Sequence, residues 1–160
     1  DGLLHYDANG EAIKSFHVRD GLGVKMLMDA GIQVAVLSGR DSAILPKRIS
    51  DLGIKLFFLG KLEKESACLD LMKQAGVTAE QTAYIGDDSV DLPAFATCGL
   101  SFAVADSAPY VQNAVNYVLV LGGGKGAFRE MSDMILHAQG KDEVYTSAKG
   151  FLKSVKNMGQ

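Results

Sequence analysis

The stretch Tyr84–Pro93, with the sequence YIGDDSVDLP, decides the fold. Residues 82–85 form a short apolar run with β-branched ends, which predicts a buried strand. Gly86 lets the backbone turn sharply after that run. Two adjacent carboxylates, Asp87 and Asp88, then stand at the C-terminal tip of the strand, and Asp91 follows just inside a new helix. This acidic tip is the reference point for the elements on either side.

The three carboxylates have two interpretations. Carboxylates crowded in this way repel one another unless a cation lies among them, and hard oxygen ligands suit Mg²⁺. The alternative is a solvated acidic turn in which Asp88 or Ser89 caps the following helix. A short motif does not decide between a metal site and a turn by itself.

Composition excludes several classes of protein. The 160 residues and 17.0 kDa predict one domain, and a hydrophobic content of 48% with a mean hydropathy of +0.11 predicts a well-filled core. A net charge of −3 and a pI near 5.6 argue against nucleic acid or an anionic membrane as partner. Cys68 and Cys98 form no C-x-x-C pair, so we expect two reduced core thiols in a cytoplasmic protein and no metal knuckle or disulfide framework.

Residues 3–18 predict a β-hairpin around the pair Asn9-Gly10, which favours a tight turn. A two-residue loop would place Tyr6 opposite Ile13 on one face, and Leu3 opposite Phe16 on the other. Because both faces then carry apolar groups, we expect one to pack on its own domain and the other on a neighbouring subunit.

From Asp20, which can cap a helix, the chain alternates between helices and strands. Helices are expected at about 20–31, 41–52, 62–75, 92–95, 108–114, 127–139 and 143–155, and strands at about 32–37, 55–59, 82–85, 101–104 and 117–121. Pro46 must lie in the first turn of its helix or kink it. The alternation predicts βαβ units and a doubly wound, Rossmann-like α/β fold with a mostly parallel sheet. We divide this single domain into a hairpin (about 3–18), a core (about 20–139) and a C-terminal tail (about 140–160).

Three polar segments fall at the C-terminal edge of that sheet, where such folds bind ligands. They are Ser38-Gly39-Arg40, the segment from Gly60 to Lys64, and Asp87-Asp88. A hydroxyl, an ammonium and paired carboxylates suit a phosphate group together with Mg²⁺. Lys64 could instead be an ordinary solvated lysine, but a cation is unfavourable at a helix start unless an anion lies nearby.

The order of these segments resembles motifs two, three and four of the haloacid dehalogenase-like phosphatases. Receiver domains of two-component systems use similar groups, but their acid pair precedes the hydroxyl and the lysine. The hairpin, HVRDG at 17–21, LGKLEK at 59–64 and GGGKGAFRE at 122–130 further resemble the 3-deoxy-D-manno-octulosonate (KDO) 8-phosphate phosphatases. The resemblance implies a core without a separate cap domain and a homotetramer whose hairpins pack across subunits, with C-terminal tails near neighbouring active sites.

One departure from that family concerns the nucleophile. Members begin with a strand ending D-x-D-G-V-L-[TS]-D-G, whose first Asp attacks phosphorus and whose second is the acid/base. Here only the final pair, Asp1-Gly2, is present. We therefore expect the native protein to extend upstream by this strand.

The resemblance also implies the role of each site residue. Asp87 would bind Mg²⁺ directly, with Asp88 and Asp91 orienting ligands and waters around it. Ser38, Lys64 and Asp88 form the expected catalytic set, in which Ser38 and the Gly39 amide hold phosphoryl oxygens that Lys64 neutralises. The expected substrate contacts are His17, Val18, Arg19, Asp20, Gly21, Lys25, Gly39, Arg40, Arg48 and Lys64. For Lys25 and Arg48, an ordinary surface position is the alternative.

The glycine run Gly122–Gly126 is not a P-loop, because Leu119 replaces its first glycine and Gly126 its hydroxyl residue. It is either a flexible turn or, by the resemblance, part of the active-site rim, with Arg129 as a carboxylate contact or an ion-pair partner.

The resulting hypothesis is a Mg²⁺-dependent phosphomonoesterase of lipopolysaccharide precursor biosynthesis. It would hydrolyse KDO 8-phosphate to KDO and inorganic phosphate through an aspartyl-phosphate. One alternative substrate is the phosphate of a nine-carbon sugar acid. The alternative from another class is a non-catalytic tetramerisation module of the same fold.

Overall fold

The computed structural model describes residues 2–158. Its strands are β1 (His5–Asp7), β2 (Gly10–Ile13), β3 (Ala35–Leu37), β4 (Leu56–Phe58), β5 (Ala83–Gly86), β6 (Leu100–Ala103) and β7 (Tyr117–Val118). Its helices are α1 (Val18–Asp29), α2 (Leu45–Leu52), α3 (Lys64–Ala75), α4 (Leu92–Thr97), α5 (Pro109–Gln112), α6 (Ala127–Ala138), α7 (Glu143–Thr146) and α8 (Ala148–Met158), with 3-10 turns η1 (Ala79–Gln81) and η2 (Ser89–Asp91). None of these helices is long and apolar enough to cross a membrane.

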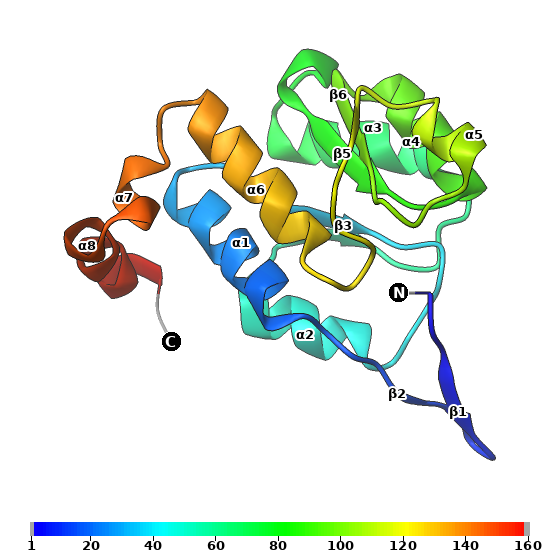
Figure 1. The fold of residues 1–160 in the computed structure, drawn as a ribbon. Helices are drawn as coiled ribbons and strands as arrows, with labels where there is room; N and C mark the ends of the chain where they lie inside the picture. Colours follow the sequence, from blue (N-terminus) through cyan, green and yellow to red (C-terminus); the bar gives the residue numbers. More distant parts are fainter. Residues whose placement is uncertain (1, 159–160) are drawn as a thin grey trace.

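The predicted α/β fold with parallel strands between helices is confirmed (Figure 1). Pro46 lies in the first turn of α2, where its missing N–H costs nothing, and α2 consequently begins later than predicted. The parallel strands form two half-sheets, β3-β4 and β5-β6-β7. Within residues 2–158, β3 pairs with β4 and β5 with β6, and no ladder joins β3 to β5. One continuous sheet was expected, so this division is a correction.

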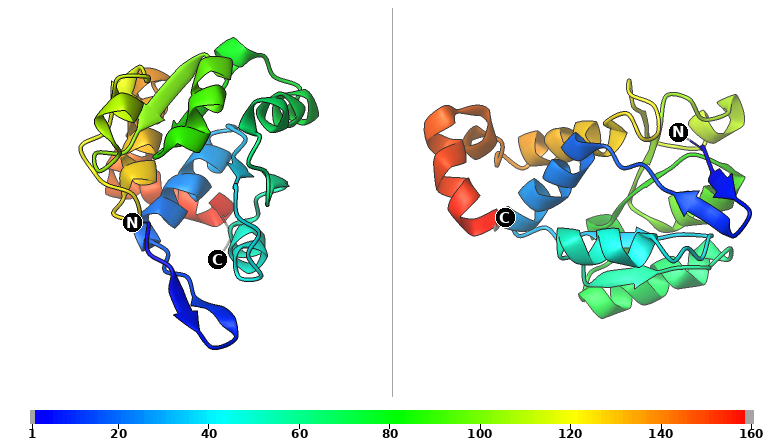
Figure 2. Two further views of the ribbon diagram at one scale, coloured as in Figure 1. Left: turned by 90° about the vertical axis from the view of Figure 1, so that its right-hand side faces the viewer. Right: turned by 90° about the horizontal axis from the view of Figure 1, so that it is seen from below.

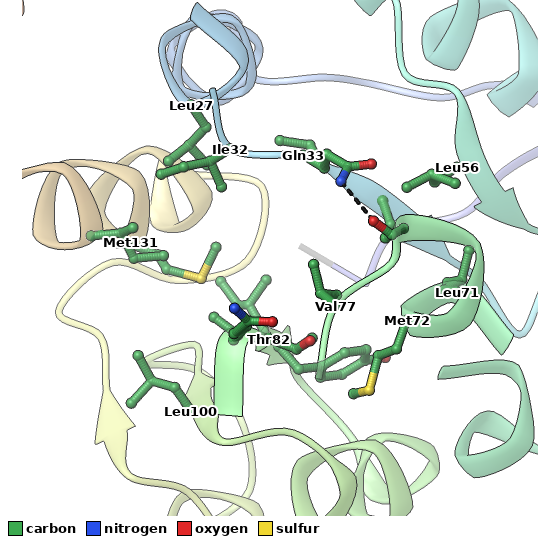
Figure 3. A pocket seen from close by; sticks show the side chains of 18 of the residues that line it. Leu27, Ile32, Gln33, Leu56, Leu71, Met72, Val77, Thr82, Leu100 and Met131 are labelled. Atoms are coloured by element: carbon green, nitrogen blue, oxygen red, sulfur yellow. Dashed lines mark hydrogen bonds between the residues drawn. The ribbon is translucent and has the colours of Figure 1, made fainter. Parts of the chain in front are cut away.

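A cavity of about 610 Å³ lies between the facing edges of β3 and β5. In Figure 3, Leu27 of α1 and Met131 of α6 line one side of it, and Met72 of α3 lies on the other. Ala35 and Ala83, although in core strands, are exposed here. We call this apolar space the strand slot. Apolar contacts still connect the two half-sheets around it, since Leu37 of β3 and Tyr84 of β5 pack against one cluster.

The hairpin projects from the body of the molecule (Figures 1 and 2). Its loop is Ala8-Asn9, closed by Asp7, whose carboxylate accepts the Asn9 N–H at 2.7 Å. The register pairs Tyr6 with Glu11 and leaves an irregularity between His5 and Tyr6, so the predicted pairing of Tyr6 with Ile13 is wrong. The apolar side chains Leu3, Tyr6, Ile13 and Phe16 are all exposed, so the expectation that one apolar face packs on the protein's own domain is wrong.

Helix α1 begins at Val18, and His17 occupies its N-cap position without a side-chain capping bond. The predicted cap at Asp20 is therefore wrong. Asp20 lies inside the first turn and accepts the backbone N–H of Arg129 at 2.9 Å, which joins α1 to α6. A Cβ on Gly23 would lie 3.2 Å from the Cα of Arg129, so glycine permits this close helix packing.

The C-terminal segment packs on α1 (Figure 1). The predicted helical stretch 143–155 is broken at Ser147 into α7 and α8. Both helices are tied to Asp29, whose carboxylate accepts the Tyr145 hydroxyl at 2.9 Å and the Ser154 hydroxyl at 2.7 Å. Burial, followed by the hydrogen bond to Asp29 and the charge of Asp29, raises the pKa of Tyr145 to about 12.

Candidate active site

The three predicted polar segments follow β3, β4 and β5 and lie at one edge of the half-sheets. The tips of β3 and β4 are bonded to each other, since the Lys61 N–H donates to the Ser38 carbonyl at 3.0 Å. Lys64 begins α3 immediately after this contact. Its ammonium reaches Asp91, beyond the tip of β5, at 2.5 Å. The structure therefore brings residues of the second, third and fourth motifs together.

Asp91 is the centre of this arrangement. It is 2% exposed. Its Oδ1 accepts from the Lys64 ammonium and, at 2.7 Å, from the Tyr84 hydroxyl. Its Oδ2 accepts the backbone N–H groups of Asp87 at 2.9 Å and Asp88 at 3.2 Å. One buried carboxylate thus fixes both the lysine and the backbone of the acidic loop.

Lys64 is itself only 6% exposed, so the alternative of a solvated lysine is wrong. Its Nζ also donates to the Tyr84 oxygen at 3.1 Å. An ammonium has three N–H donors, and two have protein partners here. The third has no hydrogen-bond partner among the described residues.

The electrostatics of the loop follow from this burial. Desolvation alone would raise the pKa of Asp91, but hydrogen bonds from Lys64 and Tyr84 outweigh it and hold that pKa below its usual value. Burial, reinforced by the Asp91 charge, raises the pKa of Tyr84, so its hydroxyl remains a donor. The pKa of Asp87 is raised by desolvation and then by Asp91, although its side chain reaches solvent. A cation beside Asp87 would offset both effects.

Asp88 is a helix cap, as the alternative interpretation of the acidic turn predicted. It is the N-cap of η2, and its carboxylate accepts the Ser89 N–H at 2.7 Å. Both Asp87 and Asp88 still present side chains to solvent. No group of three or more His, Cys, Asp or Glu side chains converges as a metal site among residues 2–158. Mg²⁺ is commonly held by one or two carboxylates, with phosphate and water completing its coordination. The donor set therefore fits Mg²⁺.

The Ser38 turn is closed on itself. The Ser38 hydroxyl donates to the Arg40 carbonyl at 3.0 Å and accepts the Arg40 N–H at 3.2 Å. A Cβ on Gly39 would lie 3.1 Å from Leu62, so this turn lies against the segment that leads to Lys64.

The hairpin positions the predicted substrate arginines. Arg40 donates to the Tyr6 hydroxyl at 3.0 Å. Arg48 lies over the Phe16 ring at 5.5 Å from the ring centre, and its Nη2 would be 2.4 Å from a Cβ on Gly21. Arg48 is thus held between the hairpin and the first turn of α1. Val18 and Arg19 are exposed in that turn, and Lys25 is half-buried further along α1.

The glycine run contacts an exposed carboxylate, Asp106. The Gly123 N–H donates to Asp106 at 2.8 Å, and a Cβ on Gly122 would collide with the same carboxylate. At its end, Gly126 faces His17, whose buried Nδ1 has no hydrogen-bond partner among the described residues. The Arg129 guanidinium binds Asp133 at 2.8 Å. Of the two roles expected for Arg129, a carboxylate contact with substrate or an ion pair within the protein, the structure shows the ion pair.

Comparison with known proteins identifies the family. Residues 60–121 match the haloacid dehalogenase-like hydrolase family. The chain is 82% identical over 160 residues to the 3-deoxy-D-manno-octulosonate 8-phosphate phosphatase KdsC of Haemophilus influenzae, covering all of this chain and 89% of that protein. It belongs to the KDO 8-phosphate phosphatase family.

Solved structures of this family superpose closely. The cobalt-bound form of the Haemophilus influenzae phosphatase has a TM-score of 0.97 and 82% identity, covering 99% of this chain and 90% of that one. The Moraxella catarrhalis phosphatase, in complex with magnesium ion, phosphate ion and KDO, has a TM-score of 0.86 and 35% identity, covering 90% and 83% of the two chains. The family resemblance predicted from the motifs is confirmed.

Sequence reasoning missed three residues of this site. The alternation of apolar residues places Tyr84 in a buried strand but does not show that its hydroxyl meets Lys64 and Asp91. Tyr6 was assigned only to an interface, yet it binds Arg40. Asp106 belongs to no recognised motif, and nothing in the sequence indicated that the glycine run would bond to it.

Proposed function

We propose that this protein is a Mg²⁺-dependent phosphatase that hydrolyses KDO 8-phosphate to KDO and inorganic phosphate through an aspartyl-phosphate. The observation that carries the proposal is the bond of Lys64 to Asp91, which also holds the backbone of the acidic loop. It places a buried ammonium beside the carboxylates that suit a metal ion. The 82% identity to the Haemophilus phosphatase supports the substrate.

Each site residue then has a proposed task. Asp87 binds the metal, and Asp88 orients the waters around it. When bound, Mg²⁺ neutralises charge on the phosphoryl oxygens. The Ser38 hydroxyl and the Gly39 amide hold those oxygens, while the free N–H of Lys64 offsets the charge that develops on them. Because Asp91 and Tyr84 fix the lysine in advance, little reorganisation accompanies the reaction.

The nucleophile is proposed to reside on a strand that precedes Asp1 and occupies the strand slot. The slot is apolar, and residues of both β3 and β5 line it. A strand running parallel to both would join the half-sheets into the predicted continuous sheet, with its C-terminal end at the edge that carries Asp87. A D-x-D-G sequence at that end would meet the metal and phosphate sites.

A synthetic peptide tests this proposal. An apolar strand sequence ending D-x-D-G, added to the 160-residue chain, should raise its melting temperature and generate phosphatase activity. A matched peptide ending N-x-N-G should stabilise the chain without activity, because it fills the slot but carries no nucleophile. Peptides that neither bind nor stabilise would refute strand insertion.

Selectivity is proposed to come from cations around the open site, chiefly Arg40 and Arg48, with His17, Arg19, Asp20, Gly21 and Lys25 completing the substrate surface. A sugar acid offers a second negative charge, which bidentate arginine binding suits. In the chain with its N-terminal strand, kcat/KM for KDO 8-phosphate should greatly exceed that for glucose 6-phosphate. Equal values would indicate a general phosphatase, and preference for a nine-carbon sugar acid phosphate would identify the alternative substrate.

Two substitutions sharpen the test. Replacing Arg40 by alanine should cost about 1.5–3 kcal/mol in transition-state binding of KDO 8-phosphate and little for glucose 6-phosphate. Asp87→Ala should abolish the Mg²⁺-dependent activity, since it removes a carboxylate ligand that supplies both negative charge and a coordination position to the metal. Asp51→Ala, an exposed carboxylate paired with Lys47, is the control and should leave activity unchanged. An active Asp87→Ala enzyme would contradict the metal assignment.

The assembly is proposed to be a cytoplasmic homotetramer held largely by hairpins. The exposed side chains of Leu3 and Phe16 support an interface, and the free thiols of Cys68 and Cys98 suit a reducing compartment. Changing Leu3 and Phe16 to lysine should lower the oligomeric state in sedimentation, because each charge would be buried against a neighbour. A wild-type protein that sediments as a monomer at micromolar concentration would refute the tetramer.

A further inference from the structure

Two cysteines far apart in the sequence meet beside the site. The Sγ atoms of Cys68 and Cys98 lie 3.5 Å apart, although 30 positions separate the residues in the chain. Both are free thiols. Cys68 is 4% exposed and borders the strand slot, whereas Cys98 is half-buried at the end of α4.

These thiols join the two helices that carry the central ion pair. Cys68 lies one turn after Lys64 on α3, and α4 starts directly after Asp91 and ends at Cys98. Both sulfurs belong to the apolar cluster against which Tyr84 packs. Since the Tyr84 hydroxyl bonds to Lys64 and Asp91, one tyrosine side chain connects the cluster that holds the thiol pair with the ion pair.

We propose that Cys68 and Cys98 form an oxidation site, at which hydrogen peroxide closes an intramolecular disulfide between α3 and α4. A disulfide needs the sulfurs at about 2.05 Å, so they must approach by roughly 1.5 Å. That approach draws α3 toward α4 at the level of Tyr84, and turnover by Lys64 and Asp91 falls as a result. The effect on turnover rests on the proposed function, whereas the cross-link does not.

The chemistry favours Cys68 as the first residue to react. A hydrogen bond from the Cys98 thiol lowers the pKa of Cys68, and a thiolate is the form that attacks peroxide. Its sulfur takes one oxygen, the O–O bond breaks, and hydroxide leaves, which gives a sulfenic acid. The Cys98 sulfur then attacks the Cys68 sulfur, and its thiol proton leaves with the displaced hydroxide as water. In total, two thiols and one peroxide give one disulfide and two waters.

Mass spectrometry of the peroxide-treated protein tests the cross-link. The wild-type chain should lose two hydrogen atoms and both titratable thiols, yield a linked peptide containing Cys68 and Cys98, and recover fully with dithiothreitol. Cys98→Ser should stop at the sulfenic acid, which dimedone traps on Cys68. Cys68→Ser should leave Cys98 unmodified at the same dose. Unchanged thiols, cross-links between molecules, or over-oxidation of Cys68 in the wild-type chain would overturn the proposal.

A second measurement separates the cross-link from its consequence. In the chain with its N-terminal strand, oxidation should lower kcat several-fold, and dithiothreitol should restore it. Cys98→Ser, treated with the same peroxide dose and diluted into buffer without dithiothreitol, should retain more activity than the oxidised wild type. The melting temperature should rise for the oxidised wild type because the disulfide restricts the unfolded chain. A complete cross-link with unchanged kcat would overturn the coupling to Lys64. An enzyme inactive even when reduced would refute the proposed function and leave the cross-link result standing.

Discussion

Two parts of the site are built in contrasting ways. The acid-loop half comprises the buried Lys64 and Asp91 and the half-buried Tyr84, which are hydrogen-bonded to one another. The hairpin half comprises the exposed contact of Tyr6 with Arg40 and the part-buried contact of Glu11 with Ser42. Polar bonds in a buried setting are costly to break, whereas exposed ones contribute little. The proposed chemistry is thus assigned to the rigid part and the proposed substrate selectivity to the more exposed part.

The largest effect is expected from removing the central charge. Asp91→Asn should lower the free energy of unfolding by about 3–5 kcal/mol, because Lys64 would remain buried without its counter-ion. The matched change in the hairpin half is Glu11→Gln, which weakens a 2.5 Å bond to the buried Ser42 hydroxyl but leaves no buried charge unpaired, because Lys14 is partly exposed, and should cost about 0.5–1.5 kcal/mol. Urea unfolding measures both, and equal costs would erase the contrast.

Glycine substitutions probe the same contrast by packing. A Cβ on Gly86 would lie 2.4 Å from the carboxyl carbon of Asp91, which hydrogen bonds hold in place. Gly86→Ala should therefore cost about 1–3 kcal/mol of stability. In Gly39→Ala, the nearest atom is the end of the exposed Leu62 side chain, which can move, so thermal unfolding should change little. A tolerant Gly86 would mean that the acidic loop is not rigid.

Tyr84→Phe sharpens the comparison further. The substitution keeps the ring, which packs edge-on against Phe95, and removes only the hydroxyl that bonds to Lys64 and Asp91. We expect a loss of about 0.5–1.5 kcal/mol in unfolding free energy. In the chain with its N-terminal strand, kcat should fall more than KM rises, since the lysine loses one of its positioning contacts.

The smallest effect is expected from Tyr6→Phe, the same chemical change in the hairpin half. It removes an exposed hydrogen bond to Arg40, so stability should change by less than about 0.5 kcal/mol. Any effect should appear in KM for a carboxylate-bearing substrate, because Arg40 loses its orientation. A stability loss equal to that of Tyr84→Phe would show that the two halves are equally rigid.

The sequence predicted what depends on local pattern. Apolar runs and glycine stops located the strands and helices, and the parallel topology required Ser38, Lys64 and Asp87 to reach one edge. It also predicted that Lys64 needed an anion. The identity of that anion, Asp91, could not be deduced, because a helix start and an acidic loop 27 residues apart meet only through the tertiary fold.

Other features depend on interactions that no local pattern contains. The hairpin register depends on the turn that the Asp7 side chain closes, and the observed register pairs Tyr6 with Glu11 in place of the predicted Ile13. The meeting of Cys68 and Cys98 depends on how α3 packs against α4. The division of the sheet could not be predicted, because a strand pattern indicates which segments are strands but not which strand edges pair with one another.

The strand slot has a consequence for how the protein folds and survives. Parallel pairing joins segments distant in the chain, and such contacts form late in folding. Until the slot is filled, the edges of β3 and β5 present unpaired N–H and C=O groups that another chain can adopt as a template. An N-terminal central strand would be synthesised first and yet find its place last. Aggregation during synthesis, and its dependence on chaperones, should therefore be governed by the time those two edges remain open.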